Sequence, residues 1–160
     1  MSISIAALDL RQLRSFVADP SHLDGMPVAD GALPPNFILR AAIDALEQGR
    51  PPLWFSPFAF VDDRLGQVVG AGGFKGLPVD GRVEIGYGIA ARFRRQGFAT
   101  CAVRELVRVA FSGQAVAEVY AETAADNLAS RRVVEKVGFR HLGQRATEAD
   151  GIVDQWLKSK

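Results

Sequence analysis

A cluster of three arginines precedes a predicted helix in the segment Arg92–Val103, RFRRQGFATCAV. The N-terminal end of a helix already carries positive potential from the backbone dipole, so cations there are unfavourable by roughly a few tenths of a kcal/mol. A bound anion would remove this conflict, because free backbone N–H groups and guanidinium groups both bind phosphate. The segment therefore predicts an anion-binding site.

Within this segment, Arg94, Gly97 and Ala99 fit the pattern R/Q-x-x-G-x-G/A. Gly97 lets the backbone approach a ligand because it has no Cβ, and Ala99 keeps the first helical turn thin. We expect Arg95 to add a second contact and Arg92 to be solvated. The alternative is a solvated basic loop with a glycine at the helix start.

A second candidate site is the strand expected at Val83–Ile89, VEIGYGI. Strict alternation places Glu84, Gly86 and Gly88 on one face, where the glycines leave an open floor beside a carboxylate. Such a floor suits an extended ligand, and a bulge or a tight sheet crossing is the alternative. Gly86, Gly88 and Ala91 also match the dinucleotide fingerprint G-x-G-x-x-A. We reject that interpretation, because no helix starts at the glycines and no repeated βαβ units follow.

Length and composition restrict the class of protein. A chain of 160 residues suits one domain, 1–160, and 48% hydrophobic with 23% charged residues is typical of soluble globular proteins. A net charge of +1 argues against a nucleic-acid-binding protein. The single cysteine, Cys101, excludes an internal disulfide framework, and no Cys and His cluster suggests a metal. The N-terminus lacks the features of a signal peptide and no apolar run suggests a membrane span, so we expect a cytoplasmic protein.

Hydrophobic periodicity predicts the elements that position these residues. The segment Asn36–Gly49 has helical spacing, with Phe37, Ala41 and Leu46 on one face. Strands follow, and the second is reached through a hairpin connection at Asp62–Gly66. Their expected ranges are Leu53–Asp63, Gln67–Phe74 and Val83–Ile89. The short polar connections predict an antiparallel meander.

The second half alternates helices and strands. We expect a helix from Ala99 to Phe111, a strand at Ala115–Glu122, a helix at Asn127–Val137 with a Gly138–Phe139 cap, and two short C-terminal strands. The inward positions of the first helix are Ala99, Ala102, Val103, Leu106, Val107, Ala110 and Phe111, and those of the second are Ala129, Val133 and Val137. This order predicts the α+β class.

The motifs VEIGYGI, RFRRQGFAT, VYAET and NLASRRVVEKVGF, in this order, resemble the GNAT superfamily of acyl-CoA N-acyltransferases. The segment AETAADNLASRRVVEKVGFR resembles the Rim-type branch of ribosomal-protein N-terminal acetyltransferases. The resemblance covers Val68 to Trp156 and is weak before that. It implies the GNAT fold, a mostly antiparallel sheet splayed at its centre with helices on both faces. It also implies transfer of an acetyl group from acetyl-CoA, without a metal, to a primary amine of a protein N-terminus or a small molecule.

The resemblance implies a set of acetyl-CoA-binding residues. The turn would hold the pyrophosphate with Arg94, Arg95, Gln96, Gly97, Phe98 and Ala99. The strand Val83–Ile89 would splay from its neighbour, and the pantetheine arm would pair with the backbone of Tyr87, Gly88 and Ile89. A backbone N–H there would polarise the thioester carbonyl. Asn127 would bond to the pantetheine region or cap its own helix.

The implied chemistry is direct attack of an amine on a thioester. The amine must be neutral, which is easier for an α-amino group, with a pKa of about 7.7–8.0, than for lysine at about 10.4. Glu84 is the first candidate for the base, directly or through a water, and Glu122 is the second. The tyrosine that acts as the general acid in many members of the family is absent, because Val134 occupies its position. Ser130 could bond to the sulfur, and water or no acid is compatible with a thiol pKa near about 8.5.

Two alternative functions stay open. One is a CoA-binding module without transfer activity, which the absent tyrosine favours. The other is a small-molecule acetyltransferase that acts on an antibiotic such as an aminoglycoside, on a polyamine or on an amino acid, with an acceptor site built from the N-terminal helix region and the loop Gly76–Arg82. A basic acceptor favours an acidic pocket, but Asp62, Asp63 and Asp80 are too scattered to define one. The sequence does not identify the acceptor, and both a monomer and a homodimer are compatible with it.

Overall fold

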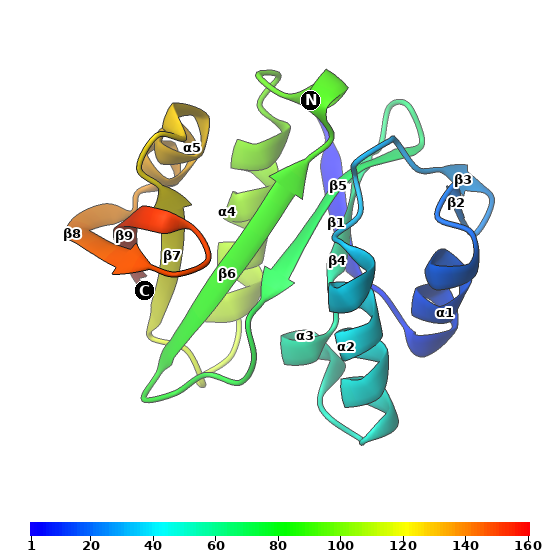
Figure 1. Ribbon diagram of the computed structural model, residues 1–160, viewed down its shortest axis with the longest axis horizontal. Helices are drawn as coiled ribbons and strands as arrows, with labels where there is room; N and C mark the ends of the chain where they lie inside the picture. The colour runs from blue at the N-terminus through cyan, green and yellow to red at the C-terminus, as the bar shows by residue number, and fades with distance from the viewer.

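A mixed sheet of seven strands forms the centre of the computed structural model, which describes residues 1–160 (Figure 1). The strand order is β1-β4-β5-β6-β7-β9-β8, and only β6 and β7 are parallel neighbours. The bounds of the strands in that order are Ile3–Ala7, Phe58–Asp62, Gln67–Phe74, Arg82–Ile89, Glu118–Ala124, Gly151–Ser159 and Arg140–Thr147. Two short strands, β2 (His22–Leu23) and β3 (Met26–Pro27), pair with each other separately.

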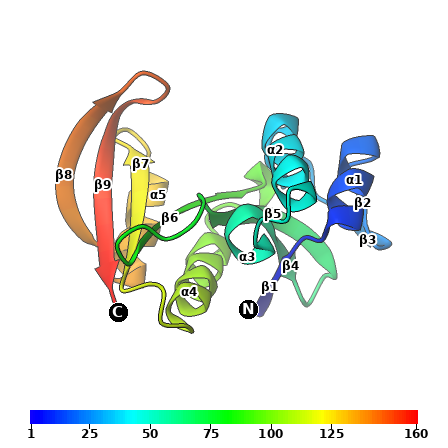
Figure 2. The same cartoon turned by 90° about the horizontal axis from the view of Figure 1, so that it is seen from below.

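Helices lie on both sides of this sheet, so the predicted α+β architecture is confirmed. They are α1 (Leu10–Ala18), α2 (Asn36–Glu47), α3 (Pro52–Phe55), α4 (Phe98–Phe111), α5 (Leu128–Val137) and the short 3-10 helix η1 (Ala91–Phe93). Figures 1 and 2 show α4 on one side of β6 and α2 on the other, with α5 beside α4. A hydrophobic core of 31 buried residues joins these layers. None of the helices has the length and apolar character needed to cross a membrane.

The predicted meander and helix caps are present. Strands β4, β5 and β6 follow one another antiparallel, and the Gly66 N–H donates to the Asp62 carbonyl oxygen at 2.9 Å across the hairpin. Gly138 has a φ of 103°, and the Phe139 N–H donates to the Val134 carbonyl oxygen at 3.0 Å, which ends α5. The buried residues of α4 are Phe98, Ala102, Val103, Leu106, Val107 and Ala110. Most of the predicted inward face of this helix is therefore confirmed.

Two expected strands have different bounds. The segment Leu53–Asp63 divides into α3 and β4, because Pro52 has the fixed φ that suits the first position of a helix. Strand β7 begins at Glu118 rather than at Ala115, because its ladder with β6 starts at the Arg82–Glu118 pair, and the Ala117 N–H before it bonds to the Gly81 carbonyl oxygen in the turn that precedes β6. Strand β1 and helix α1 were not predicted. They lie in the N-terminal region, before the first helix expected from the sequence.

The buried faces of α2 and α5 differ from expectation, because neighbouring helices rather than periodicity select the face. Leu39 and Ala42 are buried in α2, which packs on α1, whereas Phe37 is 72% exposed. Val134 is completely buried in α5, which packs on α4, whereas Ala129 is exposed. The other predicted inward positions are half-buried at Leu46, Val133 and Val137 and exposed at Ala41.

The parallel ladder between β6 and β7 is short. The two strands pair only from Arg82 to Ile85. Beyond this point β6 stays paired with β5 as far as Ile89, and β7 stays paired with β9 as far as Ala124. The sheet therefore opens between β6 and β7 towards the ends of both strands, as the resemblance implies, and α4 lies behind this opening (Figure 1).

We expect Gly72→Ala to lower the free energy of unfolding by about 1–3 kcal/mol, the usual cost of overpacking a core. A Cβ on Gly72 would lie 2.6 Å from both the Gly86 carbonyl oxygen and the Phe60 ring. The matched control is Gly88→Ala, because a Cβ on Gly88 meets nothing within 4 Å. Urea unfolding measures both variants. Equal stability of the two proteins would contradict the close approach of β5 and β6.

Candidate active site

The turn between η1 and α4 presents a row of free N–H groups. Arg95 and Gly97 adopt left-handed conformations, with φ of 62° and 89°, and Gly97 is the N-cap of α4. The backbone N–H groups from Arg95 to Thr100 donate to no acceptor in the protein. These donors lie at the positive end of a helix of 14 residues. The turn can therefore bind an anion, as the sequence predicts.

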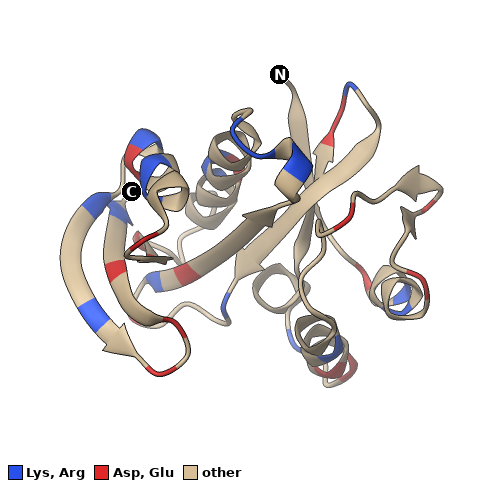
Figure 3. Ribbon diagram, turned by 45° about the horizontal axis from the view of Figure 1, so that its top comes forward, with Lys and Arg blue, Asp and Glu red and all other residues tan.

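The arginines of this turn have different environments. The Arg94 Nε donates to the Ile89 carbonyl oxygen at 3.0 Å, which ties the turn to the end of β6 and leaves the terminal nitrogens without a protein partner. The expectation that Arg92 reaches only solvent is wrong, because its side chain contacts Phe93 and Gln67. Its guanidinium lies 4.7 Å from the centre of the Phe93 ring and donates to Gln67 at 3.4 Å, so it points away from the turn. Figure 3 shows basic segments on this turn and on α5.

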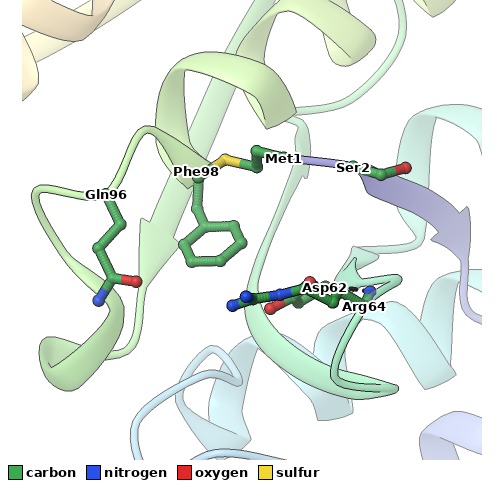
Figure 4. Close-up of a pocket in the computed structure, with 6 residues that line it drawn as sticks. All are labelled: Met1, Ser2, Asp62, Arg64, Gln96 and Phe98. Carbon is green, nitrogen blue, oxygen red and sulfur yellow. Dashed lines mark hydrogen bonds between the residues drawn. The ribbon is translucent and has the colours of Figure 1, made fainter.

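A pocket of about 530 Å³ lies next to the turn (Figure 4). Its lining residues are Met1, Ser2, Asp62, Arg64, Gln96 and Phe98. Gln96 and Phe98 come from the turn, and Arg64 comes from the β4–β5 hairpin. The Gln96 side chain donates to the Arg92 carbonyl oxygen at 3.1 Å, which fixes the shape of the turn. The pocket therefore connects the turn with the β4–β5 hairpin and brings one basic and one acidic residue, Arg64 and Asp62, next to the turn.

The edge of β6 that faces the opening carries unpaired backbone groups. The carbonyl oxygens of Glu84, Gly86 and Gly88 all face β5. By the alternation of a strand, the backbone N–H and carbonyl groups of Tyr87 and Ile89 face the opening between β6 and β7. An extended ligand could pair with them as an added strand. The predicted contacts at Tyr87 and Ile89 therefore fit, whereas Gly88 turns its backbone groups away.

Helix α5 forms the far wall of the opening. The Asn127 side chain accepts from the Ser130 N–H at 3.1 Å and so caps the N-terminal end of α5, which is the structural alternative expected for this residue. The Tyr87 hydroxyl donates to the Ser130 carbonyl oxygen at 3.4 Å and links β6 to α5 across the opening. Burial raises the pKa of Tyr87, so its hydroxyl stays protonated. Val134, the position of the family's tyrosine, is completely buried.

Glu84 stands on the opposite face of β6, in an ion pair with a lysine. Its carboxylate lies 2.8 Å from the ammonium group of Lys75 at the end of β5. Sequence reasoning did not find this partner, because Lys75 follows β5 and is brought next to Glu84 by the pairing of β5 with β6. The Lys75 side chain is 58% exposed, so the ion pair can exchange partners with a ligand.

Glu122 lies on the same face of the sheet, since Glu84 is level with Tyr120 in the β6–β7 register. Both carboxylate oxygens of Glu122 accept from Arg145, and one also accepts from the Tyr120 hydroxyl at 2.7 Å. The bonds from Arg145 hold the pKa of Glu122 below its usual range. Glu84 is also ion-paired, but with a single exposed lysine that a ligand can replace, whereas Arg145 holds both oxygens of Glu122. The geometry therefore favours Glu84 over Glu122 as the base.

A buried carboxylate that sequence reasoning missed anchors the first turn of α5. Asp154 on β9 is 0% exposed, accepts from His141 on β8 at 2.8 Å, and lies 3.5 Å from Arg131 on α5. The cluster connects the C-terminal hairpin with the helix that carries Ser130. No local pattern marks it, because its members lie on three different elements.

A second pocket, of about 380 Å³, opens on the face that carries Glu84. Its floor consists of glycines from β5 and β6, and its walls come from the start of α2 and from α3. The floor residues include Gly72, Gly73, Gly86 and Gly88. The open floor that alternation predicts is therefore present, without a bulge in the β5–β6 register. The loop Gly76–Arg82, expected at the acceptor site, does not line this pocket.

The family described as the acetyltransferase (GNAT) domain matches residues 5–140, and the chain belongs to this family. An uncharacterized N-acetyltransferase of Bacillus subtilis, YjdG, is 36% identical over 74 residues, which are 46% of this chain and 44% of that protein. The chain thus matches less than half of the length of this curated relative.

Solved structures share the fold over nearly the whole chain. The aminoglycoside acetyltransferase AAC(6')-Ib in complex with coenzyme A is 19% identical, with a TM-score of 0.71, over 99% of this chain and 95% of that chain. The ribosomal-protein-S5-alanine acetyltransferase of Vibrio fischeri is 14% identical, with a TM-score of 0.70, over 99% of this chain and 93% of that chain. At these identities the similarity establishes the fold.

We expect Arg145→Met to reduce the loss of stability in acid. The folded-state pKa of Glu122 lies below its unfolded value of about 4.3. The ion pair therefore stabilises the protein above that pH, and the stabilisation is lost as the pH falls through the folded-state pKa. Urea unfolding between about pH 6 and pH 3 measures this slope. Arg108→Met is the control, because Arg108 is exposed, and an unchanged slope in Arg145→Met would refute the assignment.

Proposed function

We propose that the protein transfers an acetyl group from acetyl-CoA to a primary amine by direct attack. One observation carries the proposal: the β6–β7 ladder ends at Ile85, next to a turn whose free N–H groups begin at Arg95. An open strand edge and an anion-binding turn on one side of α4 match a ligand with an extended amide-containing arm and a pyrophosphate. Membership of the GNAT family supports the same ligand.

The proposed placement of acetyl-CoA follows from the free donors. The pyrophosphate binds the N–H groups of the turn and the terminal nitrogens of Arg94, with Arg95 as a second cation. The pantetheine arm leads away from the turn along the edge of β6, so it meets Ile89 first and bonds to the Ile89 N–H, because Arg94 already occupies the Ile89 carbonyl oxygen. The Tyr87 N–H, which is farther from the pyrophosphate, is the donor proposed for the thioester carbonyl.

In the proposed reaction, the neutral amine nitrogen bonds to the carbonyl carbon of the thioester. The carbon–sulfur bond then breaks and its electron pair leaves with the sulfur. One proton of the amine passes to Glu84, directly or through a water, and from there to solvent. The thiolate takes up a proton from water, because Val134 offers no acid and is buried. Ser130, on the first turn of α5, is the hydroxyl residue that we assign next to the sulfur.

The acceptor is a primary amine of a protein N-terminus or of a small molecule. The Rim-type interpretation rests on the Asn127 and Ser130 pattern and is supported by the shared fold of the S5-alanine acetyltransferase. An aminoglycoside acceptor is the second candidate, supported by the shared fold of AAC(6')-Ib. The two candidates differ in the charge of the acceptor and hence in the pocket that each requires.

Coenzyme A binding tests the proposal directly. We expect the wild type to bind CoA and Arg94→Ala to raise the dissociation constant about 10- to 100-fold, the effect of losing a hydrogen bond to a charged group. Arg92→Ala is the matched control and should bind nearly as well as the wild type, because Arg92 points towards Gln67. Titration calorimetry measures all three proteins. The absence of CoA binding by the wild type would sink the proposal.

Replacing the proposed base should slow turnover without loss of CoA. We expect Glu84→Gln to lower kcat about 100-fold or more, the scale of general-base catalysis, with an unchanged dissociation constant for CoA. Glu118→Gln is the control, because it removes another ion-paired carboxylate, on the neighbouring strand β7. Thiol release from acetyl-CoA measures the rate. An unchanged pH–rate profile in Glu84→Gln would remove Glu84 as the base.

A further inference from the structure

The acceptor pocket contains no acidic residue. Of the 17 residues that line the 380 Å³ pocket, the only charged one is Lys75. Its walls are apolar and include Ile38, Phe55 and Phe74. The Trp54 ring packs edge-on against Phe74 with 4.9 Å between centroids, which fixes one wall. Glu84 lies beside the pocket, 2.8 Å from Lys75, and is not one of its lining residues. A polyamine or an aminoglycoside carries several cations and would find a single carboxylate partner there, and burying an unpaired charge is costly.

The Lys75–Glu84 ion pair places one positive and one negative group at the edge of the pocket. The stem of Lys75 lies over Gly86, since a Cβ on that glycine would lie 3.1 Å from the Lys75 Cε. The ammonium group therefore stands above the floor of the pocket, 2.8 Å from Glu84. An ammonium group has three donors, and the protein uses one of them here. A positive and a negative group thus stand side by side at the pocket.

This arrangement is complementary to a molecule that carries an ammonium and a carboxylate on neighbouring atoms. We propose that the acceptor is a free α-amino acid with an apolar side chain, whose carboxylate binds Lys75 and whose amine lies beside Glu84. This inference rests on the proposed acetyl transfer. The apolar side chain fills the pocket between α2 and α3, a volume at the lower end of the range for small-molecule sites.

The arrangement also explains how an ion-paired carboxylate acts as the base. The substrate carboxylate takes over Lys75, which is 58% exposed and can turn towards it. Glu84 then loses its cation partner and faces the amine. A carboxylate that is no longer ion-paired is free to accept a proton from the amine. Binding of the acceptor and activation of the base are therefore one event. Glu122 has no such exchange, because Arg145 and Tyr120 hold both of its oxygens.

The test compares phenylalanine and leucine with their amides, which keep the amine and the side chain and lack the carboxylate. We expect the wild type to prefer each acid over its amide in kcat/KM by about tenfold, and Lys75→Met to bring this ratio to about one. The amide reports the effect of the altered charge next to Glu84 alone, whereas the ratio of acid to amide reports the carboxylate contact together with the activation of Glu84 that depends on it. Lys136→Met is the matched control and should keep the wild-type ratio, because Lys136 lies at the exposed end of α5.

Further arms separate this inference from the proposed function. Spermidine, kanamycin and a peptide with an apolar N-terminal residue are assayed alongside, with CoA binding as the reference for folding. Preference for any of them over the amino acids, or a ratio that survives Lys75→Met, would overturn the inference and leave acetyl transfer standing. Turnover of no amine would overturn both. Should Lys75→Met fail to bind CoA, Lys75→Arg keeps the positive charge and should retain preference for the acid.

Discussion

The structure depends on the early end of pairing between β6 and β7. A backbone group without a hydrogen bond is costly when it is away from water, so a sheet that opens at its centre needs other partners on its inner edges. The protein provides one such partner on β6, because the Arg94 Nε donates to the Ile89 carbonyl oxygen. The Tyr87 hydroxyl reaches across the opening to the Ser130 carbonyl oxygen in α5 and links the two walls. The remaining groups of Tyr87 and Ile89 stay available to a ligand.

The opening also places the other parts of the site. Strand β6 ends at Ile89 and leads through η1 into the turn before α4, so the strand edge and the anion site are covalently adjacent. The left-handed conformations at Arg95 and Gly97 reverse the chain within a few residues and bring the start of α4 under the opening. One extended ligand can therefore contact both features. The glycine floor on the opposite face lies across the same strand, which places an acceptor within reach of the ligand's reactive end.

The features that the sequence predicted well are those set by adjacent residues. Gly97 and Gly138 adopt positive φ at the two helix ends where the pattern requires it, and the hairpin after β4 has its expected place. The features that it missed depend on distant segments. The partners of Glu84 and Glu122 are Lys75 and Arg145, which come from other segments of the chain, and no local pattern contains them.

Helix faces show the same limit. Periodicity identified both α2 and α5 as amphipathic helices, but it did not determine which apolar residues face the core. In α5, Val134 is completely buried because the helix packs against α4. This is the position at which the resemblance to the GNAT superfamily implies a tyrosine, and a side chain there does not reach the surface. In this protein the hydroxyl next to α5 comes instead from Tyr87, on the strand that forms the opposite wall.

The two carboxylates on one face illustrate how environment divides roles between like groups. Arg145 binds both oxygens of Glu122, Tyr120 binds one of them, and the side chain is 14% exposed. The charge of Glu122 is therefore fully paired within the sheet. Glu84 has a single partner on a flexible and largely exposed stem. An exposed ion pair contributes little to stability and is readily exchanged. The weaker of the two ion pairs is therefore the one suited to chemistry, because a ligand can replace the lysine there without disturbing the fold.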